Sequence, residues 1–134
     1  MSQADDAGKL VLRVTVGVLV LLHGIAKIAN GPDHILGLME KIGMPPELGY
    51  AVYIGEVIAP VLLIVGLFTR PAALIVAINM IVAIYLVHMN ELFALGKTGG
   101  WALELQGMFL FGALAVALLG AGRYSVGGPY GKWN

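Results

Sequence analysis

Residues 61–87 read VLLIVGLFTRPAALIVAINMIVAIYLV, two long apolar runs separated by Thr69, Arg70 and Pro71. A helix that crosses a membrane needs about 20 mostly apolar residues, and proline is tolerated in the first turn of a helix. Because the link is so short, the stretch predicts two antiparallel helices that pack as a hairpin. Neither run alternates apolar and polar residues, so the strands of a transmembrane barrel are excluded.

The composition of the whole chain also indicates a membrane protein. Of its 134 residues, 59% are hydrophobic and 12% are charged. A soluble domain carries roughly 25% charged residues, and a disordered chain is poor in apolar residues, so both classes are excluded. The formal net charge is zero, which provides no basic surface for nucleic acid, and we expect no nucleic-acid partner. The expected environment is a lipid bilayer.

Four stretches are long and apolar enough to span a membrane, namely 10–28, 48–68, 71–89 and 101–121. Each should be helical, because an isolated span has to satisfy its backbone hydrogen bonds internally. We therefore expect an all-α protein with a single membrane domain, residues 1–134. In it the four spans form an integral membrane four-helix bundle with antiparallel, up-down topology.

The segments outside the spans carry weaker signals. In loop 29–47, apolar residues recur at helical spacing from Ile35 to Ile42, which predicts a short interfacial helix between spans one and two. A plain connecting turn of helix is the alternative. The tail, residues 122–134, is rich in glycine and has no apolar period, so we expect it to be loose.

Basic residues near the span ends favour one orientation in the membrane. The side that would hold both termini carries Lys9, Arg13, Arg70, Arg123 and Lys132, and the opposite side carries Lys27, Lys41 and Lys97. Because basic residues concentrate in cytoplasmic segments, we predict that both termini are cytoplasmic.

The polar residues inside the spans are the main clue to function. Counted at about 1.5 Å per residue, they fall in the outer half of the membrane on all four spans. The inner half is almost entirely Leu, Val, Ile, Ala and Gly. Ionisable residues inside a bilayer are costly and usually face the interior of a bundle. The sequence therefore predicts a polar pocket under the outer face, with loop 29–47 as its roof.

The candidate site residues divide into two groups. The predicted catalytic residues, which would exchange protons, are Glu56, His23 and Glu104. The predicted substrate-binding residues are Lys27, Tyr53, Asn79, Tyr85, His88 and Trp101.

Several of these residues also have a structural interpretation. Lys27 could anchor its helix by reaching towards the interface, or form a buried ion pair with Glu56. Asn79 could bond neighbouring helices together. The aromatic side chains are typical of membrane-interface anchors, and His88 could simply be an interfacial residue.

Most cofactor classes are not expected. The chain contains no cysteine, which excludes iron–sulfur clusters and thiol chemistry. His23 and His88 lie on different spans, but His88 falls at the rim, so we expect no haem. The His and Glu residues lack the spacing of metal ligands, so no metal site is expected. The chain has no dinucleotide fingerprint or phosphate-binding loop, so NAD chemistry is not expected either.

Stretches from across the chain carry a family resemblance. They are LLHGIAK (21–27), Gly55–Glu56, GLFTRPAAL (66–74), the span that holds Asn79, and GAGRYS (120–125). Together they resemble the DoxX-like family of small four-helix bacterial membrane proteins. The resemblance implies a multi-pass protein of the bacterial cytoplasmic (inner) membrane. It also implies quinone-linked respiratory or oxidative-stress chemistry, carried out in some members with soluble redox proteins.

The leading hypothesis is a quinone- or quinol-interacting redox or respiratory-chain accessory component. Quinone is the suspected ligand or substrate, and a soluble redox protein or further copies of the chain are the suspected partners. Whether the chain is an enzyme stays open, because an oxidoreductase component of this kind needs a partner for its electrons. The alternatives are a non-catalytic assembly subunit of a membrane complex and a small-molecule or proton-coupled transporter.

Overall fold

A computed structural model describes residues 2–87 and 89–134, and their regular structure is helical apart from one isolated bridge between Leu95 and Trp101. The predicted all-α fold is confirmed for these residues. In chain order the elements are α1 (Gln3–Asn30), α2 (Asp33–Lys41), the 3-10 helix η1 (Pro46–Tyr50), α3 (Ala51–Tyr53), the π-helix η2 (Ile54–Ile58), α4 (Ala59–Val65), α5 (Thr69–Val87), the 3-10 turn η3 (Met89–Glu91) and α6 (Glu104–Leu119).

Three helical stretches of the described residues are long and apolar enough to cross a membrane: Gln3–Asn30, Pro46–Val65 and Thr69–Leu86. The fourth expected span is represented by α6, which is apolar but shorter. It begins at Glu104 and not at Trp101, because Trp101 is held in the preceding loop. The Trp101 indole N–H donates to the Leu92 carbonyl at 2.7 Å, and Trp101 also pairs with Leu95.

The first helix begins well before the apolar stretch that starts at Leu10, because Ser2 and Asp5 cap it. The Ser2 hydroxyl accepts from the Asp5 backbone N–H, and the Asp5 carboxylate accepts from the Ser2 N–H. The second helical stretch ends at Val65, before the expected limit at Phe68. Gly66 follows in the left-handed region, at φ 78°, which ends a helix.

One stripe of α1 forms the contact with the second helical stretch. Gly17 lies against the Pro60 carbonyl, since a Cβ added to it would sit 3.0 Å from that oxygen. Gly24 lies still closer to the Glu56 carbonyl, where there is no room for a Cβ at all. Val20, between the two glycines, is completely buried. Glycine at these positions lets the two helical backbones approach each other directly.

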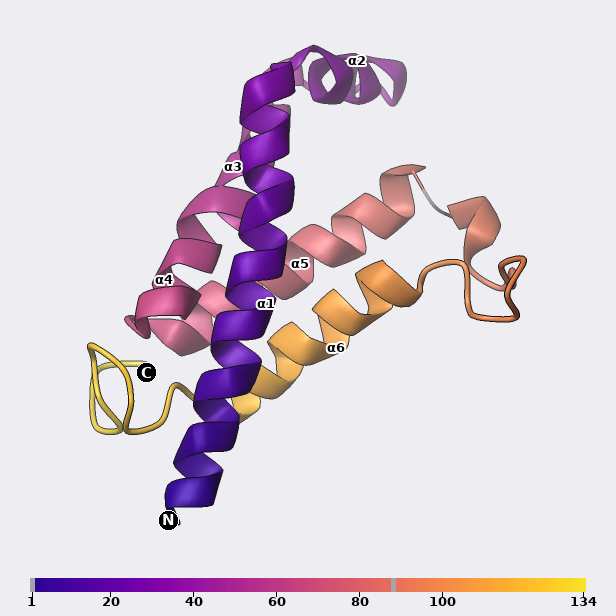
Figure 1. Cartoon of the computed structure of the whole chain (residues 1–134). Coiled ribbons are helices and arrows are strands. Elements are labelled where there is room, and N and C mark those ends of the chain that lie inside the picture. The colour runs from indigo at the N-terminus through magenta and orange to yellow at the C-terminus, as the bar shows by residue number, and fades with distance from the viewer. Residues whose placement is uncertain (1, 88) are drawn as a thin grey trace.

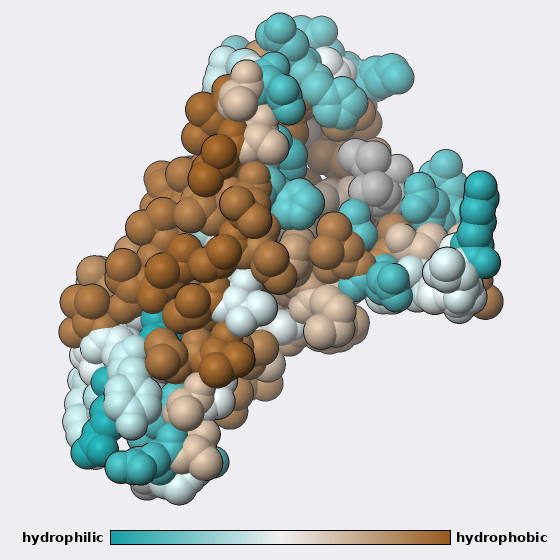
Figure 2. Space-filling model, in the orientation of Figure 1, coloured by the Kyte–Doolittle hydropathy of each residue, from teal (hydrophilic) through white to brown (hydrophobic). Residues whose placement is uncertain are grey.

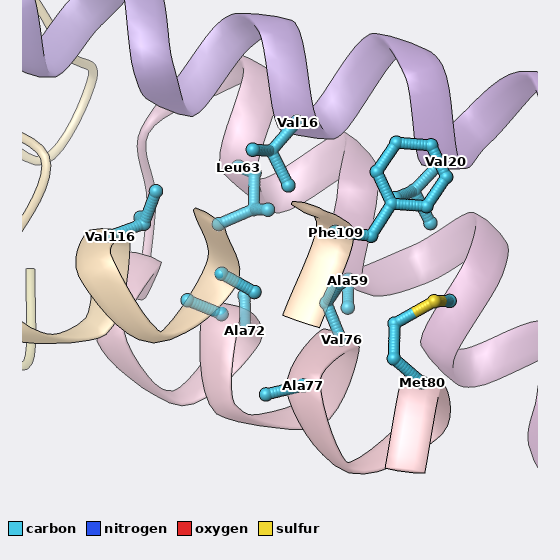
Figure 3. Close-up of a cluster of buried hydrophobic side chains, with 12 residues drawn as sticks. Val16, Val20, Ala59, Leu63, Ala72, Val76, Ala77, Met80, Phe109 and Val116 are labelled. Carbon is cyan, nitrogen blue, oxygen red and sulfur yellow. The ribbon is translucent and has the colours of Figure 1, made fainter. Parts of the chain in front are cut away.

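The hydrophobic core lies where α1, α4, α5 and α6 meet (Figure 3). Small residues of α5, such as Ala73 and Ala77, are buried there against Ala113 and Val116 of α6. Small side chains allow α5 and α6 to pack side by side along their length (Figure 1). Leu63 of α4 is completely buried in the same core.

Arginine side chains from neighbouring helices cap the carboxyl ends of two helices. Arg13 is 1% exposed, and its Nη1 donates to the Leu63 and Ile64 carbonyls at 2.7 and 2.8 Å. Arg70 Nη1 donates to the Ala117 and Leu118 carbonyls at 3.0 and 2.9 Å. A helix leaves its last carbonyls without intrahelical partners and carries partial negative charge there, so a cation is well placed.

The tail is folded against this same end of the molecule, which differs from the expectation of a loose segment. The Asn134 side-chain oxygen accepts from the Thr69 N–H at 3.1 Å, and Asn134 is 6% exposed. The Val126 and Gly127 N–H groups donate to the Val65 and Gly66 carbonyls at 2.9 and 3.0 Å. The tail supplies the backbone partners that the turn between α4 and α5 lacks, so it is ordered without an apolar period.

The outline of the molecule is an apolar belt with polar surface at both ends (Figure 2). The two termini lie at the same end (Figure 1). At the other end α2 crosses the end of α1, so the short helix predicted within loop 29–47 is confirmed. There α5 and α6 lean away from α1, and the surface is hollowed between them and α2 (Figure 2).

We predict that Arg13→Lys lowers the free energy of unfolding by about 2–4 kcal/mol, because one ammonium cannot replace a guanidinium that also donates to the Tyr124 carbonyl at 2.6 Å. Denaturant unfolding of the purified protein in detergent measures the change. Arg123→Lys is the matched control at an exposed arginine and should leave the midpoint unchanged. Equal stability of the two variants would contradict the proposed cap.

Candidate functional site

A cavity of about 280 Å³ lies under α2, between the C-terminal half of α1 and the pair α5 and α6. Its apolar walls come mainly from α5, α6 and α2, and its polar groups come from α1, α2, η2, α5 and α6. It is lined by His23, Lys27, His34, Ile35, Leu38, Val52, Glu56, Asn79, Met80, Val82, Ala83, Leu86, Leu105, Gln106 and Phe109. A polar pocket with α2 as its roof is the arrangement that the distribution of polar residues predicts.

An ion pair between Lys27 and Glu56 is the central polar contact of the cavity. Lys27 Nζ lies 2.7 Å from Glu56 Oε1 and 2.6 Å from Oε2, so the ammonium donates to both carboxylate oxygens. The Glu56 side chain is 4% exposed and that of Lys27 is 36% exposed. The carboxylate is therefore almost completely buried, while the lysine side chain is partly exposed, and both residues line the cavity.

Asn79 completes the environment of the carboxylate from the side of α5. Its Nδ2 donates to Glu56 Oε1 at 3.2 Å. Gly55 makes this contact possible, since a Cβ on Gly55 would come within 2.7 Å of Asn79 Cβ. Asn79 therefore bonds α5 to the second helical stretch, as in its structural interpretation, and it also lines the cavity.

The position of Glu56 depends on a local change of helical register. Glu56 lies in η2, a π-helical turn between α3 and α4, followed by Pro60 near the start of α4. A π-turn inserted in an α-helix rotates the side chains on one side of it relative to the other, and such turns are frequent at functional sites. The Glu56 carbonyl packs on Gly24, so the turn is held against α1 as its side chain reaches Lys27.

Two histidines lie at the edge of the cavity. His23 packs edge-on against Phe109, with ring centroids 5.7 Å apart, and is otherwise exposed. His34, in the first turn of α2, lines the cavity from above. His34 was not predicted as a site residue, although it shares the helix face of Leu38 at i, i+4. Each imidazole can donate one hydrogen bond and accept another.

Other predicted residues lie outside the cavity lining. Glu104 is exposed beside Gly100, whereas Gln106, which was not predicted as a site residue, lines the cavity. Positions two apart on an α-helix differ by about 200°, so these two face opposite ways. Tyr85 is 69% exposed on the far face of α5 from Ala83.

The remaining aromatic candidates, Trp101 and Tyr53, donate hydrogen bonds to backbone carbonyls. Trp101 bonds to the Leu92 carbonyl within the loop before α6. The Tyr53 hydroxyl donates to the Lys27 carbonyl at 3.5 Å, and Tyr53 does not line the cavity. His88 lies outside the described residues.

Among residues 2–87 and 89–134, no three His, Asp or Glu side chains are close enough to hold a metal ion together. The polar groups of the cavity instead suit hydrogen bonds to a neutral ligand. They supply imidazole, amide and ammonium donors around an otherwise apolar space.

The fold and cavity define an all-helical membrane protein with a polar site between its helices. Residues 8–89 match the family model DoxX, and the chain belongs to the DoxX family. The resemblance drawn from the sequence is confirmed. No solved structure matches the chain significantly.

Three relatives illustrate what this chain is similar to. It is 36% identical over 115 residues to an uncharacterized protein of Haemophilus influenzae, covering 80% of this chain and 84% of the relative. It is 29% identical to the "Putative oxidoreductase CatD" of Bacillus subtilis, covering 90% and 85%. It is 33% identical to an uncharacterized membrane protein of Mycobacterium tuberculosis, covering 86% and 76%.

We predict that Lys27→Met destabilises the protein by roughly 1–3 kcal/mol, because it leaves the Glu56 carboxylate buried without its cation. The effect is smaller than for a fully buried pair, since Lys27 is partly exposed. The double variant Lys27→Met with Glu56→Leu should recover most of the loss. Denaturant unfolding in detergent measures the free energy of unfolding of the wild type, the single variant and the double variant. Lys41→Met is the control at an exposed lysine. A double variant no more stable than the single one would argue against the pair.

Proposed function

We propose that this DoxX-family membrane protein binds the headgroup of a quinone or quinol in the cavity under α2, as a component of a membrane redox system. The observation that carries the proposal is the cavity itself, where apolar walls meet a few hydrogen-bonding side chains in the outer half of the helices. A quinone needs this combination, because its ring is apolar and its oxygens accept hydrogen bonds.

The dimensions of the cavity suit a single ring. Pockets for drug-sized ligands run from about 300 to 1,000 Å³ and are mostly apolar, with a few convergent polar groups. At about 280 Å³ this cavity lies just below that range. Met80, Leu86 and Phe109 provide the apolar and aromatic surface on which a quinone ring would lie.

The side chains around the ring would supply and remove protons. His23 and His34 line the cavity. There an imidazole N–H can donate to a carbonyl oxygen, and the ring can regain a proton from solvent. Lys27 carries an ammonium towards the same space and is held there by Glu56. Glu56 is thus proposed to orient Lys27, and His23 and His34 to exchange protons with the ligand.

Reduction of a quinone takes up electrons as well as protons, and a partner protein would have to supply the electrons. A soluble redox protein is the proposed donor or acceptor, docking where the cavity opens. The name of the Bacillus subtilis relative, which includes the word oxidoreductase, supports a redox role for this chain.

The proposed setting is the cytoplasmic membrane of a bacterium, crossed four times. In this arrangement α6 is the fourth span of an antiparallel bundle. Its 16 residues cover roughly 24 Å, so it would cross by local thinning of the bilayer together with the loop residues before Glu104. Both termini would be cytoplasmic, with Lys9, Arg70 and Arg123 at that face.

A non-catalytic assembly subunit is the second candidate, and the Lys27–Glu56–Asn79 cluster favours it. Its hydrogen bonds join α1, η2 and α5, as expected of polar contacts that hold membrane helices together. In that case the cavity residues would matter for assembly of the bundle but not for a ligand.

Filling the cavity separates these functions. We predict that Ala83→Phe weakens binding of decylubiquinone to the purified protein at least tenfold, because the ring occupies the space of the headgroup. Ala26→Phe is the matched control, since Ala26 is exposed on α1 and does not line the cavity. Fluorescence quenching or calorimetry in detergent measures the affinity.

His23→Ala and His34→Ala should each weaken binding several-fold, by the loss of one hydrogen bond of about 1 kcal/mol. Glu104→Gln, on the outer face of α6, should leave it unchanged. If wild-type protein shows no saturable binding, or if Ala83→Phe binds as tightly as Ala26→Phe, the quinone site is rejected. Loss of a stoichiometric membrane complex in Ala83→Phe alone would then favour the assembly subunit.

A further inference from the structure

A second site lies at the opposite end of the molecule and is independent of the proposed quinone cavity. It is a cleft of about 320 Å³ between the start of α1, the start of α5 and the tail. Three cationic side chains, Lys9, Arg70 and Arg123, line it together with one anionic side chain, Asp6. These side chains therefore leave two positive charges in excess.

The anionic member of the cleft is already engaged by the protein backbone. Asp6 is 8% exposed, and its Oδ1 accepts from the Arg123 N–H at 3.2 Å. Asp6 therefore fixes the tail against α1 and brings the Arg123 side chain to the cleft. Lys9 is also 8% exposed, because its stem packs against Gly122, where a Cβ would lie 3.2 Å from Lys9 Cδ.

Arg70 is held at the centre of this end of the molecule. Its Nη1 caps α6, and its Nη2 lies beside Gly120, where an added Cβ would come within 2.8 Å. Gly120 and Gly122 both have φ of 81°, a conformation that residues with a side chain rarely adopt. Gly120 leaves the space beside the Arg70 guanidinium free of a side chain, and Gly122 does the same beside Lys9 and Asp6.

Apolar grooves meet the cleft at the same arginine. One of about 380 Å³ is lined by Arg70, Pro71, Leu74 and Trp133. Another of about 620 Å³ is lined by Lys9 and Arg70 together with Leu118, Leu119 and neighbouring residues of α1, including Asp5, whose carboxylate caps that helix. A cationic centre with apolar grooves beside it is complementary to a phospholipid, whose phosphate is anionic and whose acyl chains are apolar.

The depth of the cleft fits the same ligand. Arg70 is the second residue of the candidate span Thr69–Leu86, so it lies at the boundary between this apolar helix and the polar segments beside it. This is the level at which lipid phosphates lie beside a membrane protein. Guanidinium groups suit phosphate oxygens, which they bind with two parallel hydrogen bonds.

We propose that this cleft binds the phosphate of an anionic phospholipid, with its acyl chains in the apolar grooves on either side of Arg70. A free phosphate offers the same charge but nothing for the grooves, so the lipid is the favoured source. The site joins α1, α5 and the tail, and an occupied site would hold these segments together at the membrane surface.

Native mass spectrometry from a neutral detergent tests the proposal, with phosphatidylglycerol and phosphatidylcholine of identical chains as the probes. The wild-type protein should retain phosphatidylglycerol at least tenfold more tightly. Arg123→Gln should weaken its binding roughly fivefold, the contribution of one basic residue near anionic lipid. Asp6→Asn should strengthen it by a similar factor, a gain that misfolding cannot imitate.

Lys132→Gln is the matched control, because Lys132 is exposed on the same tail, stacks on Trp133 at 4.7 Å and does not line the cleft. It should leave binding unchanged. Equal retention of the two lipids, or equal effects of Arg123→Gln and Lys132→Gln, would overturn the proposal. Displacement of phosphatidylglycerol by inorganic phosphate at a similar concentration would also overturn it, in favour of a soluble anion.

Discussion

The contact between α1 and the second helical stretch is the constraint on which the rest of the structure depends. Gly17 and Gly24 let the two backbones touch, and the Lys27–Glu56 ion pair lies one turn beyond Gly24. Lipid provides no hydrophobic driving force between helices, so close backbone packing and interhelical polar bonds have to hold them. Because the pair is at one end of the contact and Arg13 at the other, the register of the two helices is set by charge at both ends.

The two ends of the molecule use their charges differently. At the end with the termini, arginines satisfy helix carbonyls and the tail supplies the remaining backbone partners. At the other end, the Lys27–Glu56 pair and Asn79 satisfy one another, and α5 and α6 lean away from α1 to leave a cavity. At the end with the termini, hydrogen bonds hold the segments together and leave a cationic surface. At the other end, the helices separate and leave a cavity lined by hydrogen-bonding side chains. The proposed lipid site and the proposed quinone site follow from this difference.

Periodicity and depth predicted part of the candidate site. His23, Lys27, Glu56 and Asn79 all line one cavity, as expected for polar residues that were all predicted in the same half of the membrane. Depth alone could not separate Glu104 from Gln106, because the two are close in height but face opposite sides of α6. The side that faces inward depends on how α6 is rotated against α5, and that rotation is decided by small residues spread along both helices.

The sequence by itself determined that the chain is an all-helical membrane protein and roughly where its long helices lie, because a long apolar run that does not alternate satisfies its backbone in lipid only as a helix. The family was indicated by specific motifs, above all the stretch FTRPA at 68–72, and not by composition. Only the tertiary structure decided that Arg13 is a buried cap, that η2 turns Glu56 towards Lys27, and that the glycine-rich tail is ordered. Each of these depends on partners distant in the sequence, and an apolar helix looks the same in sequence whichever neighbour it meets.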